Sequence, residues 1–91
     1  MSSDQRTNYK LVPARTFLKD LEKQDNVTNQ RITRSIEELP QDPFMGKSLR
    51  GDLEGLYSLR VGDYRVIYSI EIKNRRINLH AARHRSKVYE K

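Results

Sequence analysis

From Leu56 to Ile70 the chain alternates apolar and polar residues with a period of two, which is the pattern of a β-strand with one buried face. The Gly62–Asp63 pair interrupts this alternation and is a favoured two-residue hairpin turn. A second turn candidate, Lys73–Asn74, precedes a further alternating run over residues 76–81. The second half of the chain is therefore predicted to form three antiparallel strands.

The two turns also fix how the predicted strands pair, because directly opposed residues share a face of a sheet. Counting outward from the turns predicts one apolar face, made by the pairs Val61–Tyr64, Leu59–Val66, Tyr57–Tyr68, Ile70–Ile77, Tyr68–Leu79 and Val66–Ala81. On the other face, Arg60 lies opposite Arg65, and His80 lies beside Ile67. Opposed arginines repel each other at a cost of up to ~1 kcal/mol. Folding alone gives no reason for this pairing, whereas an anion-binding site does.

The first half of the chain has the period of helices. Residues 9–12 form a short extended run, and Pro13 suits the first turn of a helix, where its missing N–H costs nothing. Asp25–Asn26 is a break followed by a new N-cap, and Pro40 ends the second helix. The apolar residues at helical spacing are Ala14, Phe17, Leu18 and Leu21 in the first helix and Ile32, Ile36 and Leu39 in the second.

Together these elements predict an α+β fold of order β-α-α-β-β-β. A helical hairpin is expected to pack on one face of a mostly antiparallel sheet. Residues 40–55 are rich in glycine and proline and are predicted to form a long loop. A chain of 91 residues has room for one core, so we expect a single domain over residues 1–91, with a flexible N-terminus over residues 1–7.

The positive charge is concentrated in the second half of the chain. Residues 1–49 have eight Lys and Arg against seven Asp and Glu, a net charge of +1, whereas residues 50–91 have ten against five, a net charge of +5. This distribution indicates a polyanionic partner, nucleic acid first, although a solvated basic surface or an acidic protein partner fits it too. The chain lacks cysteine, an apolar run of ~20 residues and a signal-peptide core, which favours the cytoplasm and no membrane.

The end of the chain adds a basic run to the predicted arginine face. The residues that we expect to gather near the end of the last strand are Arg83, His84, Arg85, Lys87 and Tyr89. Imidazole titrates near neutrality, so His84 is a candidate for proton transfer, and His80 on the open face is a weaker one. Two scattered histidines without cysteine make a poor metal site, and we expect neither a metal nor a cofactor.

The run from Leu56 to Tyr68, preceded by residues 49–51, resembles the central hairpin of the RelE/ParE toxin superfamily. The run from Arg83 to Tyr89 is similar to the C-terminal signature of its RelE branch. The resemblance implies a RelE-like fold and the toxin of a type II toxin–antitoxin system. Such a toxin is a metal-independent endoribonuclease that cleaves mRNA in the ribosomal A site and forms a hetero-oligomer with a RelB-like antitoxin.

The resemblance also implies roles for individual residues. Arg65 corresponds to the arginine that contacts the scissile phosphate, and Arg60 to a basic residue on the preceding strand. Arg83 corresponds to the arginine that opens the C-terminal signature, and Tyr89 to the tyrosine implicated in proton transfer. Ser58 departs from the pattern, since some members have a second lysine there, so the site here is less basic or recruits His84 or Arg85 instead.

Several points stay open from the sequence. The proton-transfer group is either Tyr89 or His84. The residues expected to bind RNA are Arg60, Arg65, Arg83, Arg85 and Lys87. One alternative function is a ParE-like toxin that inhibits DNA gyrase and cuts no RNA. Another is a non-catalytic member of the fold, whose arginine face only binds nucleic acid or an acidic protein.

Overall fold

The computed structural model describes residues 9–87. Its elements are β1 Lys10–Pro13, α1 Arg15–Glu22, α2 Asn26–Ile36, η2 Pro43–Met45, β2 Lys47–Ser48, η3 Gly51–Leu53, β3 Tyr57–Val61, β4 Tyr64–Glu71, β5 Arg76–His84 and η4 Arg85–Lys87, where η marks a 3-10 helix. The predicted flexible N-terminus over residues 1–7 and the predicted site residue Tyr89 lie outside the described residues. Within residues 9–87, no helix has the length and apolar character needed to span a bilayer.

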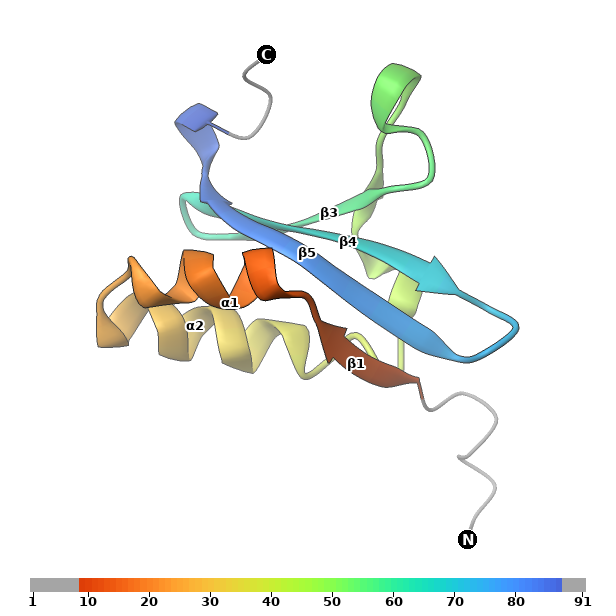
Figure 1. The fold of residues 1–91 in the computed structure, drawn as a ribbon, viewed down its shortest axis with the longest axis horizontal. Helices are drawn as coiled ribbons and strands as arrows, with labels where there is room; N and C mark the ends of the chain where they lie inside the picture. Colours follow the sequence, from red (N-terminus) through yellow and green to blue (C-terminus); the bar gives the residue numbers. More distant parts are fainter. Residues whose placement is uncertain (1–8, 88–91) are drawn as a thin grey trace, which may run out of the picture.

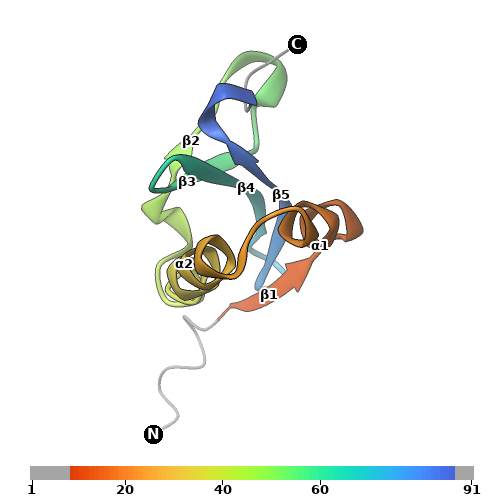
Figure 2. The ribbon, with the colours of Figure 1, turned by 90° about the vertical axis from the view of Figure 1, so that its left-hand side faces the viewer.

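The strands form one sheet of order β1-β5-β4-β3-β2. β1 runs parallel to β5, and the other neighbouring strands are antiparallel. Both α-helices lie on the same face of this sheet, as Figures 1 and 2 show from two directions. The predicted α+β fold, with a helical hairpin on one face of a mostly antiparallel sheet, is confirmed.

The short edge strand β2 is absent from the predicted order of elements. Its two residues, Lys47 and Ser48, pair with Ser58 and Tyr57 of β3. Both are exposed, so this strand has no apolar alternation that could have marked it in the sequence. The prediction of a loop throughout residues 40–55 was wrong here, because pairing with β3 and not a local pattern makes the strand.

The helix signals of the sequence are largely confirmed. Asp25 is the N-cap of α2, and its carboxylate accepts a hydrogen bond from the backbone N–H of Thr28 at 2.8 Å. That bond favours the charged carboxylate and so holds the pKa of Asp25 below its usual value. The helix ends at Ile36, one turn before Pro40, and Leu39 is fully buried in the turn that follows.

Two details of the first helix differ from the prediction. Pro13 is the last residue of β1, where it pairs with Leu79, and Ala14 is the N-cap of α1. The strand extends one residue further because the parallel pairing with β5 continues to Pro13. Leu18 is 47% exposed and lies outside the core, whereas Phe17 is buried. The eight residues of α1 therefore bury a narrower stripe than the sequence predicted.

The core lies between the helices and the covered face of the sheet. Its buried members are Phe17, Ile32, Ile36, Leu39, Leu59, Val61, Val66, Tyr68, Ile77, Leu79 and Ala82. Tyr68 has no exposed surface, and its hydroxyl donates to the carbonyl oxygen of Pro43 at 2.8 Å and accepts from the N–H of Gly46 at 3.0 Å. Burial raises the pKa of Tyr68, because the neutral hydroxyl is favoured away from water. This tyrosine ties η2 to the centre of the sheet.

The pairing of β4 with β5 contains a β-bulge. Tyr68 pairs with Leu79 as predicted, but Ile67 pairs with Ala81, so His80 is an extra residue on β5. Val66 consequently pairs with Ala82, and the predicted pair with Ala81 was wrong. The extra residue shifts the remainder of β5 by one position relative to β4.

Candidate active site

Three arginines lie side by side across the uncovered face of the sheet. Arg65 of β4 pairs with Arg60 of β3 on one side and with Arg83 of β5 on the other. Their neighbours Val61, Val66 and Ala82 are buried in the core, and side chains alternate between the faces of a strand. Neighbouring strands are about 4.8 Å apart, so the three Cα positions form a short row. We call Arg60, Arg65 and Arg83 the arginine row.

The sequence predicted the Arg60–Arg65 pair but not the place of Arg83 within the row. Without the bulge, Arg65 would lie opposite Ala82, and Arg83 would lie on the face that the helices cover. Because His80 is inserted, Arg83 moves into register with Arg65. The bulge therefore completes the row, and bulges commonly re-aim side chains in this way.

The acidic side chain of Asp20 contacts the row. Asp20 of α1 accepts a hydrogen bond from Nε of Arg83 at 3.0 Å and another from the backbone N–H of Ala82 at 2.9 Å, both through Oδ2. Asp20 is 6% exposed, whereas the side chain of Arg83 is 48% exposed. Asp20 was not among the predicted site residues, because nothing in a single acidic residue on a helix indicates a contact with a strand more than sixty residues away.

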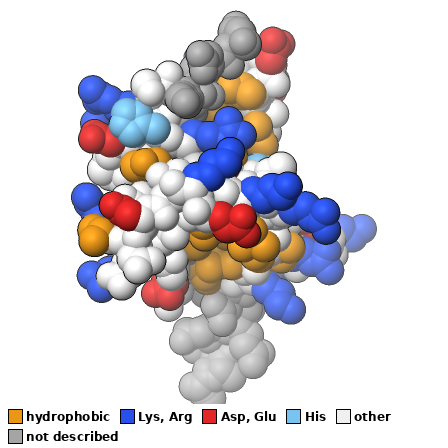
Figure 3. Space-filling view, turned by 60° about the vertical axis from the view of Figure 1, so that its left-hand side comes forward, with side chains coloured by type: hydrophobic (Ala, Val, Ile, Leu, Met, Phe, Trp, Pro, Cys, Tyr) orange, Lys and Arg blue, Asp and Glu red, His pale blue; other side chains and the backbone are white. Residues whose placement is uncertain are grey.

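Two 3-10 helices, η3 and η4, flank the uncovered face of the sheet (Figure 1). Figure 1 shows η3 and η4 rising from the sheet on the side away from the helices. The N–H of Arg85, the first residue of η4, donates to the carbonyl oxygen of Asp63 at 2.7 Å, so the chain after β5 is tied to the β3–β4 turn. Figure 3 shows Lys and Arg side chains on the side of the molecule that it displays, with acidic side chains between them. The arginine row itself places three positive charges on one face of the sheet, and this local charge suits an anion.

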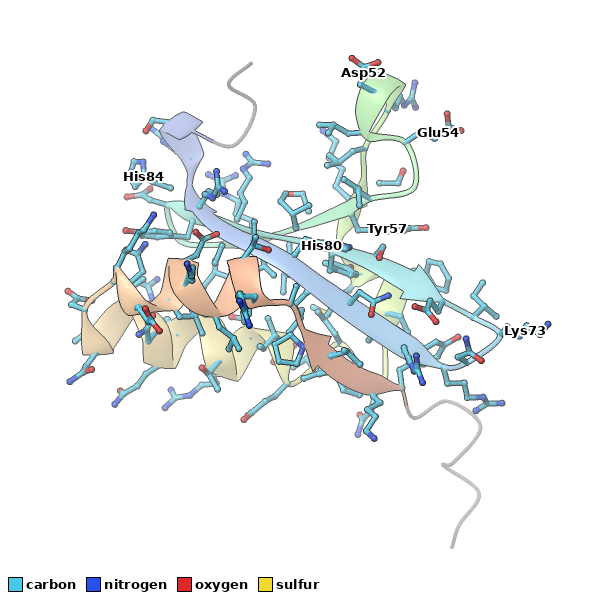
Figure 4. All side chains as sticks on the ribbon, in the orientation of Figure 1. Asp52, Glu54, Tyr57, Lys73, His80 and His84 are labelled. Atoms are coloured by element: carbon cyan, nitrogen blue, oxygen red, sulfur yellow. The ribbon has the colours of Figure 1, made fainter. Side chains whose placement is uncertain are left out.

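The two histidines occupy different surroundings. Nε2 of His80 lies 2.8 Å from the hydroxyl oxygen of Ser69, a residue on the uncovered face, so the bulged histidine points to the same side as the arginine row. His84 lies at the far end of β5, next to η4 (Figure 4). It pairs with Tyr64, and the two rings meet edge to face at 5.4 Å between centroids. His84 follows Arg83 on the strand and so points to the opposite face.

The other predicted site residues are less fully defined. Ser58, at the position of the missing lysine, is 4% exposed, and its hydroxyl has no hydrogen-bond partner among the described residues. Arg85 is exposed at the start of η4, and Lys87 is the last residue of that helix. Tyr89 lies outside the described residues, so its place relative to the arginine row stays a prediction.

Comparison with known proteins identifies the family of the chain. The profile of the family described as "ParE toxin of type II toxin-antitoxin system, parDE" matches residues 11–89. The chain belongs to this family, and so to the RelE/ParE toxin superfamily. Members of this family are described as toxins of type II toxin–antitoxin systems. The match covers the two helices, the sheet and all three arginines.

Individual relatives within the superfamily have RelE-type names. The chain is 55% identical over 40 residues to Toxin RelE of Mycobacterium tuberculosis, a match that covers 43% of this chain and 41% of the relative. It is 43% identical over 49 residues to Toxin RelK of the same organism, which covers 48% of this chain and 58% of the relative. The chain thus spans about half the length of these curated relatives.

Solved structures extend the likeness over the whole fold. The RelBE2 toxin–antitoxin complex of M. tuberculosis contains a chain with 30% identity and a TM-score of 0.71, and the match covers 86% of this chain and 99% of that one. The isolated RelE toxin of E. coli superposes with a TM-score of 0.74 at 21% identity, over 89% of this chain and 90% of that one. At that identity the second comparison supports the fold alone.

Proposed function

We propose that this toxin is an endoribonuclease that cleaves mRNA in the ribosomal A site and so stops translation. The observation that carries the proposal is the arginine row, Arg60, Arg65 and Arg83, on the uncovered face of the sheet. Three like charges on neighbouring strands repel one another and are unfavourable for folding. A bound RNA phosphate attracts all three and so offsets this repulsion. The RelE-type names of the similar proteins support the same activity.

RNA cleavage without a metal uses the ribose 2′-hydroxyl as the nucleophile. The 2′-oxygen forms a bond to phosphorus, the bond from phosphorus to the 5′-oxygen breaks, and the products are a 2′,3′-cyclic phosphate and a free 5′-hydroxyl. A base takes the proton of the 2′-hydroxyl, an acid returns one to the 5′-oxygen, and cations stabilise the extra negative charge on phosphorus. Guanidinium groups suit the last task, because each holds two phosphate oxygens and stays charged.

We assign this charge stabilisation to Arg65 and Arg83, with Arg60 in support. Arg85 at the start of η4 and Lys87 at its end are proposed to bind the RNA backbone. The proton-transfer role falls to Tyr89, by its resemblance to the RelE signature. His84 pairs with Tyr64 on the side of the sheet away from the row, so we do not give it this role.

The proposed partners follow from the same assignment. The message is the substrate of the reaction, and the ribosome positions the RNA for a small enzyme with few catalytic groups. The solved structures with similar chains include toxin–antitoxin complexes, one of them RelBE2, so we propose a RelB-like antitoxin that silences this toxin. All of these partners place the activity in the cytoplasm.

The experiment is cleavage of a defined message in a purified translation system, with the ends mapped by primer extension. The wild-type chain is expected to cut within codons, and Arg65→Ala to lower the rate by about 100-fold or more. Arg65→Lys keeps the positive charge but loses the paired N–H donors of the guanidinium, which hold two phosphate oxygens at once. This variant should therefore also lose most of the activity. The matched control is Arg34→Lys on α2, away from the row, which should cleave like wild type. An Arg65→Lys variant that cleaves like wild type would show that Arg65 contributes only its charge and makes no two-point phosphate contact.

A ParE-like gyrase inhibitor is the second candidate, and the matched family profile favours it by its description. It requires the fold but no catalytic pair of Arg83 and Tyr89. Intact message in the translation assay, together with broken DNA when the chain is incubated with gyrase, would select this function. Cleaved message with unaffected gyrase would select the ribonuclease.

A further inference from the structure

The outer edge of β5 changes partner half-way along the strand. β1 pairs with it only as far as Leu79. Beyond that point the N-terminal part of α1 contacts the edge: the N–H of Ala14 donates to the carbonyl oxygen of Leu79 at 2.9 Å, and the hydroxyl of Thr16 donates to that of His80. The last of these contacts is the N–H of Ala82, which donates to the carboxylate of Asp20.

The Asp20 contact differs from the others because it reaches a charged side chain. The same carboxylate oxygen accepts from Nε of Arg83 at 3.0 Å and forms an ion pair with it. Burying a carboxylate is costly unless hydrogen bonds and an opposite charge compensate it. Asp20 is 6% exposed and has both. A neutral acceptor such as serine would suffice to satisfy the N–H of Ala82, so the edge alone does not account for a charge at this position.

We infer that Asp20 is a positioning residue that sets the guanidinium of Arg83 for an RNA phosphate. The inference rests on the proposed function. The ion pair engages Nε, so the two terminal nitrogens, which form the fork of a guanidinium, are not part of it. Arg65 repels Arg83 from the neighbouring strand. Asp20 offsets this repulsion and, through its contact with Nε, fixes the side chain of Arg83.

Isosteric replacement separates this role from a structural one. Asp20→Asn keeps an oxygen that can accept from the N–H of Ala82 and removes the charge that holds Arg83. A matched control is Thr16→Val, which removes the neighbouring edge hydrogen bond to His80 and does not touch Arg83. If Asp20 only completes the edge of β5, Asp20→Asn should behave like wild type, because it keeps the acceptor for Ala82, and it should be no more impaired than Thr16→Val.

The kinetic test is single-turnover cleavage of ribosome-bound message, in wild-type and Arg83→Ala backgrounds. Asp20→Asn is expected to slow cleavage about tenfold or more with little change in the ribosome concentration that gives half the maximal rate, because misplacement of a catalytic group affects the reaction step. In the Arg83→Ala background it should have no further effect. Equal losses in both backgrounds, or faster cleavage by Asp20→Asn, would overturn the inference.

A second measurement does not depend on cleavage. In ¹⁵N-labelled full-length toxin, co-produced with its antitoxin and then separated from it, the Nε–H signal of Arg83 should exchange with water more slowly and be less mobile than that of Arg60. Asp20→Asn should abolish this difference, and Thr16→Val should keep it. Equal exchange of the two signals in wild type would overturn the inference even if the variant does not fold. A protected Arg83 signal in a toxin that cuts no message would instead overturn the ribonuclease proposal and leave the ion pair confirmed.

Discussion

Arg65 lies directly opposite Arg83 in the pairing of β4 with β5, although an unbroken ladder from the Lys73–Asn74 turn would set Arg65 against Ala82. The one extra residue at the bulge, His80, causes this difference. With Arg60 on the far side, the fold holds three cations on adjacent strands. Natural sheets avoid opposed like charges, so the row indicates a function that outweighs its cost in stability.

The first prediction concerns that cost. Arg60→Gln removes one charge from the row and should raise the free energy of unfolding by up to ~1 kcal/mol at low salt. Arg60 is exposed, so the substitution removes no buried contact. Urea denaturation at low and at high salt measures the effect, and the gain should shrink as salt screens the repulsion.

Arg34→Gln on α2 is the control for the Arg60 experiment. Arg34 lies in the last turn of its helix, where a positive charge interacts favourably with the helix dipole. Its removal should leave stability unchanged or slightly lower. A gain of the same size in both variants would reflect the high net charge of the chain instead of the arginine row.

The sequence was sufficient for the part of the site that local geometry determines. The Gly62–Asp63 turn fixes the register of the hairpin within a few residues, so Arg60 could be placed opposite Arg65 by counting. The hairpin's apolar alternation also identified the covered face correctly. Both inferences depend only on residues close in the chain.

The bulge and the Asp20 contact could not be predicted, because both depend on residues far apart in the chain. The hydroxyl of Thr16 contacts the carbonyl oxygen of His80, and Asp20 contacts Arg83. These interactions form only after α1 has packed beside β5. A periodic pattern that runs through Leu79 and Ala81 gives no sign of an extra residue between them.

The second prediction concerns the hydroxyl of Tyr68. Tyr68→Phe preserves the buried ring but leaves the carbonyl oxygen of Pro43 and the N–H of Gly46 without their partner. Loss of a buried hydrogen bond costs about 1–3 kcal/mol, and the free energy of unfolding in urea should fall by that amount. Tyr57→Phe is the control: its ring is half-buried, and no hydrogen bond of its hydroxyl is found in residues 9–87, so its stability should change little. Equal losses of stability in the two variants would mean that the hydrogen bonds of the Tyr68 hydroxyl contribute nothing specific.

The third prediction concerns acid sensitivity at the start of α2. The N–H of Thr28 lowers the pKa of Asp25 in the folded chain, so the carboxylate stabilises the fold above its unfolded pKa. This contribution is lost as the pH falls through the lower, folded pKa. Asn caps helices about as well as Asp but does not titrate, so the stability of Asp25→Asn relative to wild type should rise as the pH falls from 7 to 2. Urea midpoints at both pH values measure this, and a constant difference between the two proteins would contradict it.

The fourth prediction concerns the β3–β4 turn beneath η4. Gly62 has φ +61°, a backbone conformation that costs other L-residues about 1–2 kcal/mol, so Gly62→Ala should lower the free energy of unfolding by that amount. The added Cβ would also lie 3.0 Å from Nη2 of Arg31. Comparing Gly62→Ala in wild-type and Arg31→Ala backgrounds separates the two causes. Backbone strain predicts the same loss in both backgrounds, because it does not depend on a neighbouring side chain. A loss that disappears in the Arg31→Ala background would assign the effect to the contact with Arg31.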